Sequence, residues 1–410
     1  MTKMHSTFKQ WRALLAALMI LSTPAAHAET KIDCRASGTF EAWLERFKQE
    51  AIAQGISRSA ISAAAPYLVY DQRIVNIDRG QRIFSQQFLE FSDKMLAGAR
   101  ISNGISLIHK HAALFARAEK EYGVPAPVIV AFWGLESDFG ANMGNYPALK
   151  SLTTLAYDCR RAEMFRGHLF DALRLIERGD LQPADMIGSW AGEIGQTQMM
   201  PSEYFKYAVD YDGDGKRNLR SSVADVIGST ANYLASLGWK RGEPWLQEVR
   251  IPSYLPWDQA DLTITIPRAN WAGWGITLAD GKALPADQLK ASLLLPMGRF
   301  GPSFLAYDNF QVYLKWNNSL VYSTTAAYFA ARLAGAPAIH RGTGPIPPVT
   351  YEETRELQQL LIKRGYDVGG ADGKLGLSTR AAIRAMQIKL NLPADSYPTP
   401  ELLQRMRALR

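Results

Sequence analysis

The amino-acid sequence predicts a mainly α-helical protein with a small mixed α/β insertion and a separate C-terminal unit of three helices. Apolar residues recur at intervals of three and four from Phe40 to about Leu246, as they do in amphipathic helices. Six prolines and short alternating segments replace this periodicity between about Trp245 and Pro302. A Pro/Gly-rich segment then precedes about sixty residues with three helical patterns.

The N-terminus has the layout of a secretory signal peptide. Three basic residues precede an apolar run, which ends at a small-x-small cleavage pattern at residues 26–28 (AHA). The run is too short to span a bilayer, and no lipoprotein-type cysteine adjoins the cut. A buried N-terminal helix is the alternative. We expect residues 1–28 to be removed and the protein to be periplasmic, without stable membrane insertion.

Length and charge narrow the class of protein. The roughly 380 remaining residues are more than a single hydrophobic core usually holds together. We therefore expect domains at 29–334 and 351–410, joined by a linker at 335–350. The net charge of +7 includes three basic residues of the leader, so the chain without the leader carries +4. This positive charge would weakly attract an anionic polymer such as the cell wall. The basic residues are dispersed, so a nucleic-acid partner is not expected.

The element boundaries follow from local signals along the chain. Gly55 is a helix stop and Ser57 a cap, and Asp225 or Ser221 is expected to cap the helix that ends at Gly238.

Later segments are assigned in the same way. Residues 262–266 alternate as a strand does, and the helical pattern resumes from 303 to 333. In the C-terminal unit, a first helix carrying Leu357 is followed by helices at 379–390 and 399–406.

The two cysteines, Cys34 and Cys159, are expected to form a disulfide in an oxidising compartment. Neither has the setting of a catalytic nucleophile.

Glu136 is the first candidate catalytic residue. It follows an almost wholly apolar helix that starts near Pro125, just before residues that favour helix termination. Burial and the helix dipole both disfavour the anion there, so the pKa of Glu136 should rise to suit a general acid. The alternative is a carboxylate that only caps the helix or pairs with an arginine.

A second stretch, residues 189–202, mixes small, amide and thioether side chains. Ser189 and Gln198 offer hydrogen bonds, and Met199 and Met200 an apolar floor, which suits a sugar groove. A Gly-rich turn before a core helix would have a similar composition.

Together the motifs at 134–140 (GLESDFG), 195–202 (GQTQMMPS) and 231–234 (ANYL) resemble the lytic murein transglycosylase B family, glycoside hydrolase family 103. The resemblance runs from about Phe40 to Leu333. It implies a lysozyme-like helical domain that cuts the β-1,4 bond between N-acetylmuramic acid and N-acetylglucosamine. Glu136 would act as acid and then base, while the muramoyl 6-hydroxyl attacks and leaves a 1,6-anhydromuramoyl end.

The resemblance also implies substrate-binding residues. Ser189, Gln198 and Met200 would line the subsites beside the acid. In the stretch 316–322 (WNNSLVY), Asn317 and Tyr322 would contact substrate or orient the acid, although the family more often has Tyr where this chain has Trp316.

Two alternatives to this activity stay open. Most glycosidases use two carboxylates, and Glu193 or Asp138 is the rival second group for a hydrolytic muramidase. A tethered nucleophile makes that group dispensable, which favours the transglycosylase. The other alternative is a wall-binding protein without catalysis.

No cofactor is required for this chemistry, but a structural calcium ion is a candidate. Residues 210–218 fit the first half of an EF-hand loop, with Asp210, Asp212 and Asp214 alternating and the Lys216 carbonyl next. The twelfth position is a serine, and Asp225 is the substitute ligand. An Asp/Gly-rich turn without metal is the alternative.

The C-terminal segment, about 351–408, resembles the peptidoglycan-binding domain 1 family through residues 372–376 (DGKLG) and 379–383 (TRAAI). The resemblance implies a three-helix anchor that raises the local substrate concentration through the linker. A packing domain that has lost its ligand is the alternative. The expected partners are glycan strands of peptidoglycan, with wall-synthesis or remodelling proteins as candidates.

Overall fold

The computed structural model describes residues 38–80, 86–346 and 349–409. The predicted signal peptide and Cys34 lie outside these residues. The described chain is mainly helical, as predicted, and none of its helices is both long and apolar enough to cross a membrane. The α-helices are α1 (Phe40–Ala53), α2 (Arg58–Ala64), α3 (Gln72–Arg79), α4 (Phe88–Met95), α5 (Arg100–Lys110), α6 (Ala112–Tyr122), α7 (Ala126–Ser137), α8 (Ala148–Tyr157), α9 (Ala162–Glu177), α10 (Pro201–Tyr207), α11 (Val223–Ser236), α12 (Arg268–Gly273), α13 (Phe310–Trp316), α14 (Leu320–Leu333), α15 (Tyr351–Ile362), α16 (Leu377–Lys389) and α17 (Pro400–Ala408).

The strands are short. They are β1 (Tyr146–Pro147), β2 (Ile187–Gly188), β3 (Leu246–Arg250), β4 (Ile266–Pro267), β5 (Thr277–Leu278), β6 (Lys290–Leu294) and β7 (Ser303–Ala306). β1 pairs with β2, and the others form one antiparallel sheet in the order β4-β6-β7-β3-β5.

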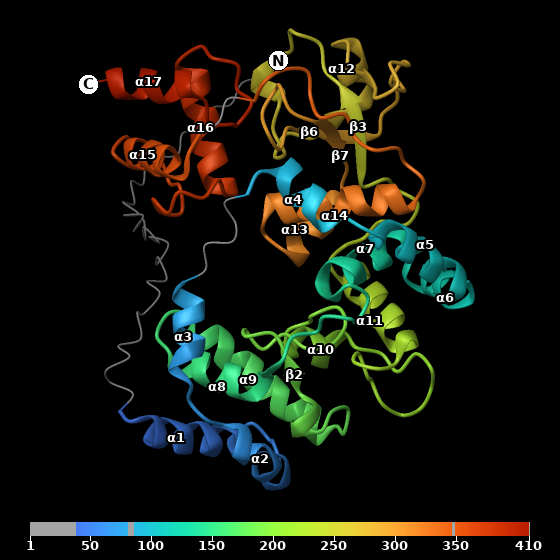
Figure 1. Ribbon diagram of the computed structural model, residues 1–410, viewed down its shortest axis with the longest axis vertical. Helices are drawn as coiled ribbons and strands as arrows, with labels where there is room; N and C mark the ends of the chain where they lie inside the picture. Colours follow the sequence, from blue (N-terminus) through green and yellow to red (C-terminus); the bar gives the residue numbers. More distant parts are fainter. Residues whose placement is uncertain (1–37, 81–85, 347–348, 410) are drawn as a thin grey trace, which may run out of the picture.

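Helix α7 lies between the two main hydrophobic cores. Its residues Val128 to Phe132 belong to a core shared with α14, whereas Trp133 belongs to a second core with α8 and α9. A helix that is packed on all sides needs apolar residues all round, which explains the apolar run in the sequence. Figure 1 shows α7 at the level where the lower helices α8–α11 give way to α13 and α14.

Capping residues set several helix ends. Ser57 caps α2, since its Oγ accepts from the backbone N–H of Ala60 at 3.2 Å, as predicted. The cap of α11 is Ser222, whose Oγ accepts from the N–H of Asp225 at 3.2 Å, so the prediction of Asp225 or Ser221 is wrong. Asp225 is buried instead and accepts from the backbone of the loop before the helix.

The sheet corrects two further predictions. Residues 303–306 form β7, and helical structure resumes only at Phe310. All four residues of β7 are buried, and such a continuous apolar run cannot be distinguished from a buried helix by its periodicity. In the predicted strand 262–266, only Ile266 belongs to a strand, β4. The sheet packs with α12 around the fully buried Trp271.

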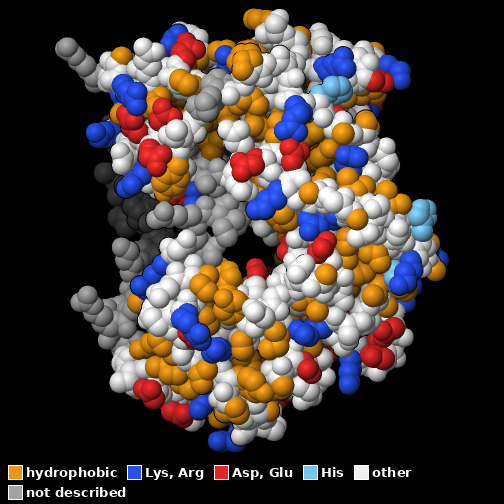
Figure 2. Space-filling view, viewed as in Figure 1, with side chains coloured by type: hydrophobic (Ala, Val, Ile, Leu, Met, Phe, Trp, Pro, Cys, Tyr) orange, Lys and Arg blue, Asp and Glu red, His pale blue; other side chains and the backbone are white. Residues whose placement is uncertain are grey.

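Helices α15–α17 form the C-terminal unit around their own small core of leucine, isoleucine and methionine side chains. Thr350 and Glu353 make a capping box at the start of α15. The preceding segment is held to the larger unit, because the N–H of Thr343 donates to the carbonyl of Phe300 at 2.9 Å. Direct contacts also join the two units, so the C-terminal unit is docked as well as tethered. Figure 2 shows the surface hollowed between the lower helices and the units above them.

Candidate active site

The carboxyl group of Glu136 lies in the last turn of α7 and is half-buried. Two donors converge on its Oε1 atom: the indole Nε1 of Trp316, at 2.9 Å, and the hydroxyl of Tyr322. Trp316 ends α13 and Tyr322 lies in the first turn of α14, so one helical hairpin supplies both. Oε2 has no hydrogen-bond partner among the residues that the structure describes, which leaves it available to a ligand.

The electrostatics favour a protonated acid near neutral pH. The pKa of Glu136 is raised to about 7, chiefly by burial; the nearby charge of Glu193 also raises it, whereas the hydrogen bonds from Tyr322 and Trp316 act in the opposite direction. Burial and the Glu136 charge raise the pKa of Tyr322 well above its usual value, so the phenol keeps its proton and remains a donor.

The chain turns sharply directly after the acid. Asp138 ends α7 in the left-handed conformation, at φ 52°, and Gly140 has φ 91°. A Cβ atom on Gly140 would lie 2.5 Å from Oε1 of Gln196, so only glycine fits there.

Gln196 joins the two sequence motifs, a role that the sequence did not reveal. Its Oε1 accepts from Nε1 of Trp133 at 2.8 Å, and its backbone carbonyl accepts from the hydroxyl of Ser137. Its amide nitrogen donates to the carbonyl of Arg220 at 2.8 Å. A buried tryptophan needs an acceptor, which was the one available signal, but sequence alone does not say which residue provides it.

Ser189 and Glu193 form a tight turn beside the site. The hydroxyl of Ser189 donates to Oε2 of Glu193 at 2.7 Å and accepts from the backbone N–H of Ala191 at 3.1 Å. Burial raises the pKa of Glu193, and its charge is felt by Glu136. Asp138, the other rival carboxylate, pairs with Arg100 at 3.0 Å. Only Glu193 of the two is therefore coupled to the acid.

The predicted groove residues have different surroundings. Gln198 adopts φ 47°, and its amide nitrogen donates to the carbonyls of Met143 and Gly195 at 3.2 and 2.8 Å. Met199 is only 2% exposed and packs in the core, so the prediction that it forms a substrate floor is wrong. Its neighbour Met200 is half-buried at the start of α10.

Asn317 and Tyr322, which were predicted to contact substrate or orient the acid, make different contacts. Oδ1 of Asn317 accepts from the N–H of Ser319 at 2.9 Å, and its carbonyl accepts from the hydroxyl of Ser323 at 2.7 Å. Asn317 therefore holds the turn between α13 and α14, whereas Tyr322 contacts the acid. Trp316 provides the second donor to the acid.

The acidic loop gathers three carboxylates. Oxygen atoms of Asp210, Asp212 and Asp214 lie within 4.8 Å of one another. The backbone N–H groups of residues 213–215 donate to Asp210. Asp225 is not in this cluster, because its two oxygens accept from the N–H groups of Tyr211 and Asn218, both at 2.7 Å. The loop thus presents three acidic side chains, and Asp225 braces its backbone.

Cys159 is disulfide-bonded. Cys34 is outside the described residues, so the pairing of Cys34 with Cys159 stays a prediction. Next to Cys159, Arg160 and Arg161 pair with the buried Asp78, which ties this loop to α3.

Two family models match the chain. The transglycosylase SLT domain covers residues 39–331, and a peptidoglycan binding domain covers residues 350–406. The sequence is 38% identical over 157 residues to membrane-bound lytic murein transglycosylase B of Escherichia coli (strain K12). That alignment spans 38% of this chain and 43% of the relative.

Solved structures are also similar. SltB3 from Pseudomonas aeruginosa in complex with NAG-anhNAM-pentapeptide matches with a TM-score of 0.83 and 41% identity, over 90% of this chain and all of that one. The Escherichia coli lytic transglycosylase Slt35 in complex with calcium matches with a TM-score of 0.61 and 28% identity, over 71% of this chain and 92% of that one.

These matches confirm both resemblances seen in the sequence. The match to the first family model includes Glu136, Trp316 and Tyr322 and extends over more than half of the chain. The chain therefore belongs to the transglycosylase SLT domain family.

Proposed function

We propose that this protein is a lytic transglycosylase that cleaves the β-1,4 bond between N-acetylmuramic acid and N-acetylglucosamine in peptidoglycan. The observation that carries the proposal is the carboxyl group of Glu136 at the end of α7, which Trp316 and Tyr322 hold at one oxygen and whose pKa burial raises. Membership in the family and the peptide-bearing disaccharide bound by SltB3 support the substrate class.

The reaction needs only one carboxyl group. The proton on Oε2 of Glu136 passes to the glycosidic oxygen as the bond from the muramoyl C1 to that oxygen breaks. The two donors at Oε1 stabilise the carboxylate that results. The muramoyl 6-hydroxyl then attacks C1, and Glu136 takes up the hydroxyl proton, which restores the acid and leaves a 1,6-anhydro end. Tethering of the nucleophile replaces a second carboxylate.

Mass spectrometry of digested peptidoglycan tests this proposal. The wild-type protein should release fragments with anhydromuramoyl ends, and Glu136→Gln should release none while keeping the fold. Wild-type protein that leaves the polymer uncut would contradict the proposal.

A hydrolytic muramidase is the second candidate, because Glu193 is electrostatically coupled to Glu136. The tethered muramoyl 6-hydroxyl makes a second carboxylate dispensable, which favours the transglycosylase. The same digestion separates the two activities, since hydrolysis leaves reducing ends. A protein that only binds the wall would give neither product.

The acidic loop is proposed to hold a structural calcium ion through Asp210, Asp212, Asp214 and the carbonyl of Lys216. The clustering of three carboxylates supports the assignment, as does the calcium complex of Slt35. The proposed reaction uses no metal.

The remaining assignments concern organisation and location. We propose a catalytic domain at 29–334, a linker at 335–350 and a wall-binding domain at 351–410, exported to the periplasm after removal of residues 1–28. Ser189, Gln198, Met200 and Asn317 are proposed to border the glycan, and wall-remodelling proteins are candidate partners.

A further inference from the structure

The turn between α13 and α14 has two sides. The residues at its ends, Trp316 and Tyr322, donate hydrogen bonds to Glu136. The five residues between them, 317–321, form one wall of a groove of about 490 Å³. The opposite wall belongs to the C-terminal unit, from Val368 to Thr379. This groove therefore lies directly behind the residues that hold the acid.

We propose that the groove binds the peptide stem of the peptidoglycan strand whose glycan lies at Glu136. The proposal rests on the proposed function and adds a binding site that both units build together. The C-terminal unit would then read the peptide of the strand being cut, in addition to anchoring the enzyme to the wall.

The lining has the chemistry of a peptide site. Asn318 on one wall and Ser378 on the other are exposed and offer an amide and a hydroxyl group, and Leu377 is 41% exposed. Lys374 and Asp372 add charges of opposite sign to the lining. No aromatic ring, the usual platform for a sugar face, is among the described residues that line the groove. Alternating amides, methyl groups and charges match a short peptide better than a glycan.

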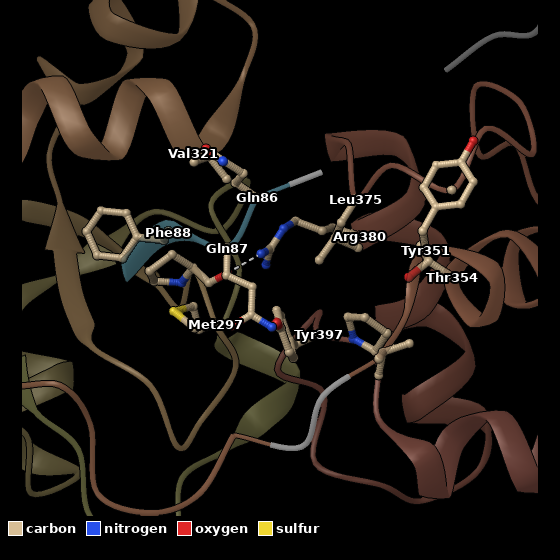
Figure 3. A pocket seen from close by; sticks show the side chains of 14 residues that line it. Gln86, Gln87, Phe88, Met297, Val321, Tyr351, Thr354, Leu375, Arg380 and Tyr397 are labelled. Carbon is tan, nitrogen blue, oxygen red and sulfur yellow. Dashed lines mark hydrogen bonds between the residues drawn. The ribbon is translucent and has the colours of Figure 1, made fainter. Parts of the chain in front are cut away.

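The two walls are held in a fixed relation by buried polar contacts. Arg380, which is 7% exposed, reaches from α16 to the carbonyls of Leu295 and Pro296. Figure 3 shows its guanidinium extended from the C-terminal unit toward the segment that carries Met297. Close by, Arg299 pairs with Asp395 at 3.2 Å. A buried guanidinium is costly to leave without acceptors, so the docking should persist in solution.

The reach of a peptide stem fits this placement. The stem leaves the muramic acid residue beside Glu136, and the groove wall 317–321 is the chain that connects Trp316 to Tyr322. A pentapeptide spans up to about 17 Å when extended. Ser319, in the groove wall, also caps α14, since its Oγ accepts from the N–H of Tyr322 at 3.3 Å.

Titration calorimetry with N-acetylmuramoyl-pentapeptide tests the groove on the full chain. Ser378→Trp and Asn318→Trp fill it from opposite walls, and each should weaken binding at least fivefold. Gln404→Trp is the matched control, because Gln404 is exposed on α17 outside the groove. It should bind the probe as the wild-type protein does. Equal affinity of the wild-type protein and both filled variants would overturn the proposal.

A second experiment, the kinetics of strand cleavage, distinguishes this inference from the proposed function. The ratio of kcat/KM for peptide-bearing over peptide-free strands should fall at least fivefold in Ser378→Trp and stay constant in Gln404→Trp. An unchanged ratio in Ser378→Trp would overturn the groove while leaving the transglycosylase intact. Loss of probe binding in Ser378→Trp, with no anhydro product from the wild-type protein, would support the groove and contradict the reaction.

Discussion

Nε1 of Trp316 lies 2.9 Å from Oε1 of Glu136. The indole and the hydroxyl of Tyr322 share that one oxygen, which leaves the other for the glycosidic bond. The arrangement fixes the direction of the acid and stabilises its anion, and several predictions depend on it.

Trp316→Phe should raise the pKa of Glu136 above about 7, because a hydrogen bond to the carboxylate lowers that pKa and would be lost. The acid then stays protonated to higher pH, so the alkaline limb of the kcat/KM profile should move upward. Activity at neutral pH should fall roughly tenfold, as a hydrogen bond to a charged group contributes about 1.5–3 kcal/mol. Trp257→Phe is the control, because Trp257 packs against the separate core of the five-stranded sheet, and it should keep the wild-type profile. A profile unmoved in Trp316→Phe would refute the role of the indole.

Glu193→Gln should have the opposite effect on the profile. The charge of Glu193 raises the pKa of Glu136, so its removal should lower that pKa and move the alkaline limb to lower pH. Asp138→Asn is the matched control, because Asp138 pairs with Arg100 and asparagine also tolerates the left-handed conformation. Anhydro ends should persist in Glu193→Gln. Complete inactivity of Glu193→Gln would instead show that cleavage needs a second carboxyl group.

Gly140→Ala should destabilise the packing between the motifs at 134–140 and 195–202. Alanine is strained at φ 91°, and its Cβ would collide with Gln196. Gly179→Ala offers a control, with φ 80° and no atom within 4 Å of the added Cβ. The control should lose about 1–2 kcal/mol of stability from backbone strain. Gly140→Ala should lose about 1–3 kcal/mol more from overpacking, measured by urea unfolding. Equal losses would show that the contact with Gln196 is unimportant.

Calcium should stabilise the protein without being consumed by the reaction. A ligand that binds only the folded state raises the melting temperature by mass action. Calcium should therefore raise the melting temperature, and Asp210→Asn should remove that response. Asp185→Asn, an exposed acidic residue outside the loop, should keep it. The same melting temperature with calcium and with a chelator would argue for a turn that binds no metal.

How much of the site could be read from the sequence depended on the range of the contacts. The end of α7 and the position of Glu136 follow from local patterns, namely an apolar run and a terminating turn. The indole of Trp316 could not be assigned in this way, because it meets the acid across 180 residues of chain. Met199 was misplaced for the same reason, since a thioether in a motif has the same sequence signature in a groove as in a core.

The errors in the fold have related causes. Ser222 caps α11, whereas the carboxylate of Asp225 accepts a hydrogen bond from the backbone of the acidic loop. Cap preferences describe only neighbouring residues, so they do not predict this contact with the loop. Strand β7 was predicted to be helical because it is buried on both faces and lacks alternation. The docking of Arg380 depends on carbonyls about 85 residues away, and such a long-range pairing leaves no local pattern.

The pKa of the Glu136 side chain tests the central claim most directly. It can be measured by carbon-13 NMR titration of the glutamate carboxyl groups, with Glu136→Gln to assign the signal. The account predicts that one carboxyl titrates near pH 7, as the buried acid should. A Glu136 signal that titrates near the ordinary value of about 4.3 would contradict it, because the group would then be ionised before any glycosidic oxygen could receive its proton.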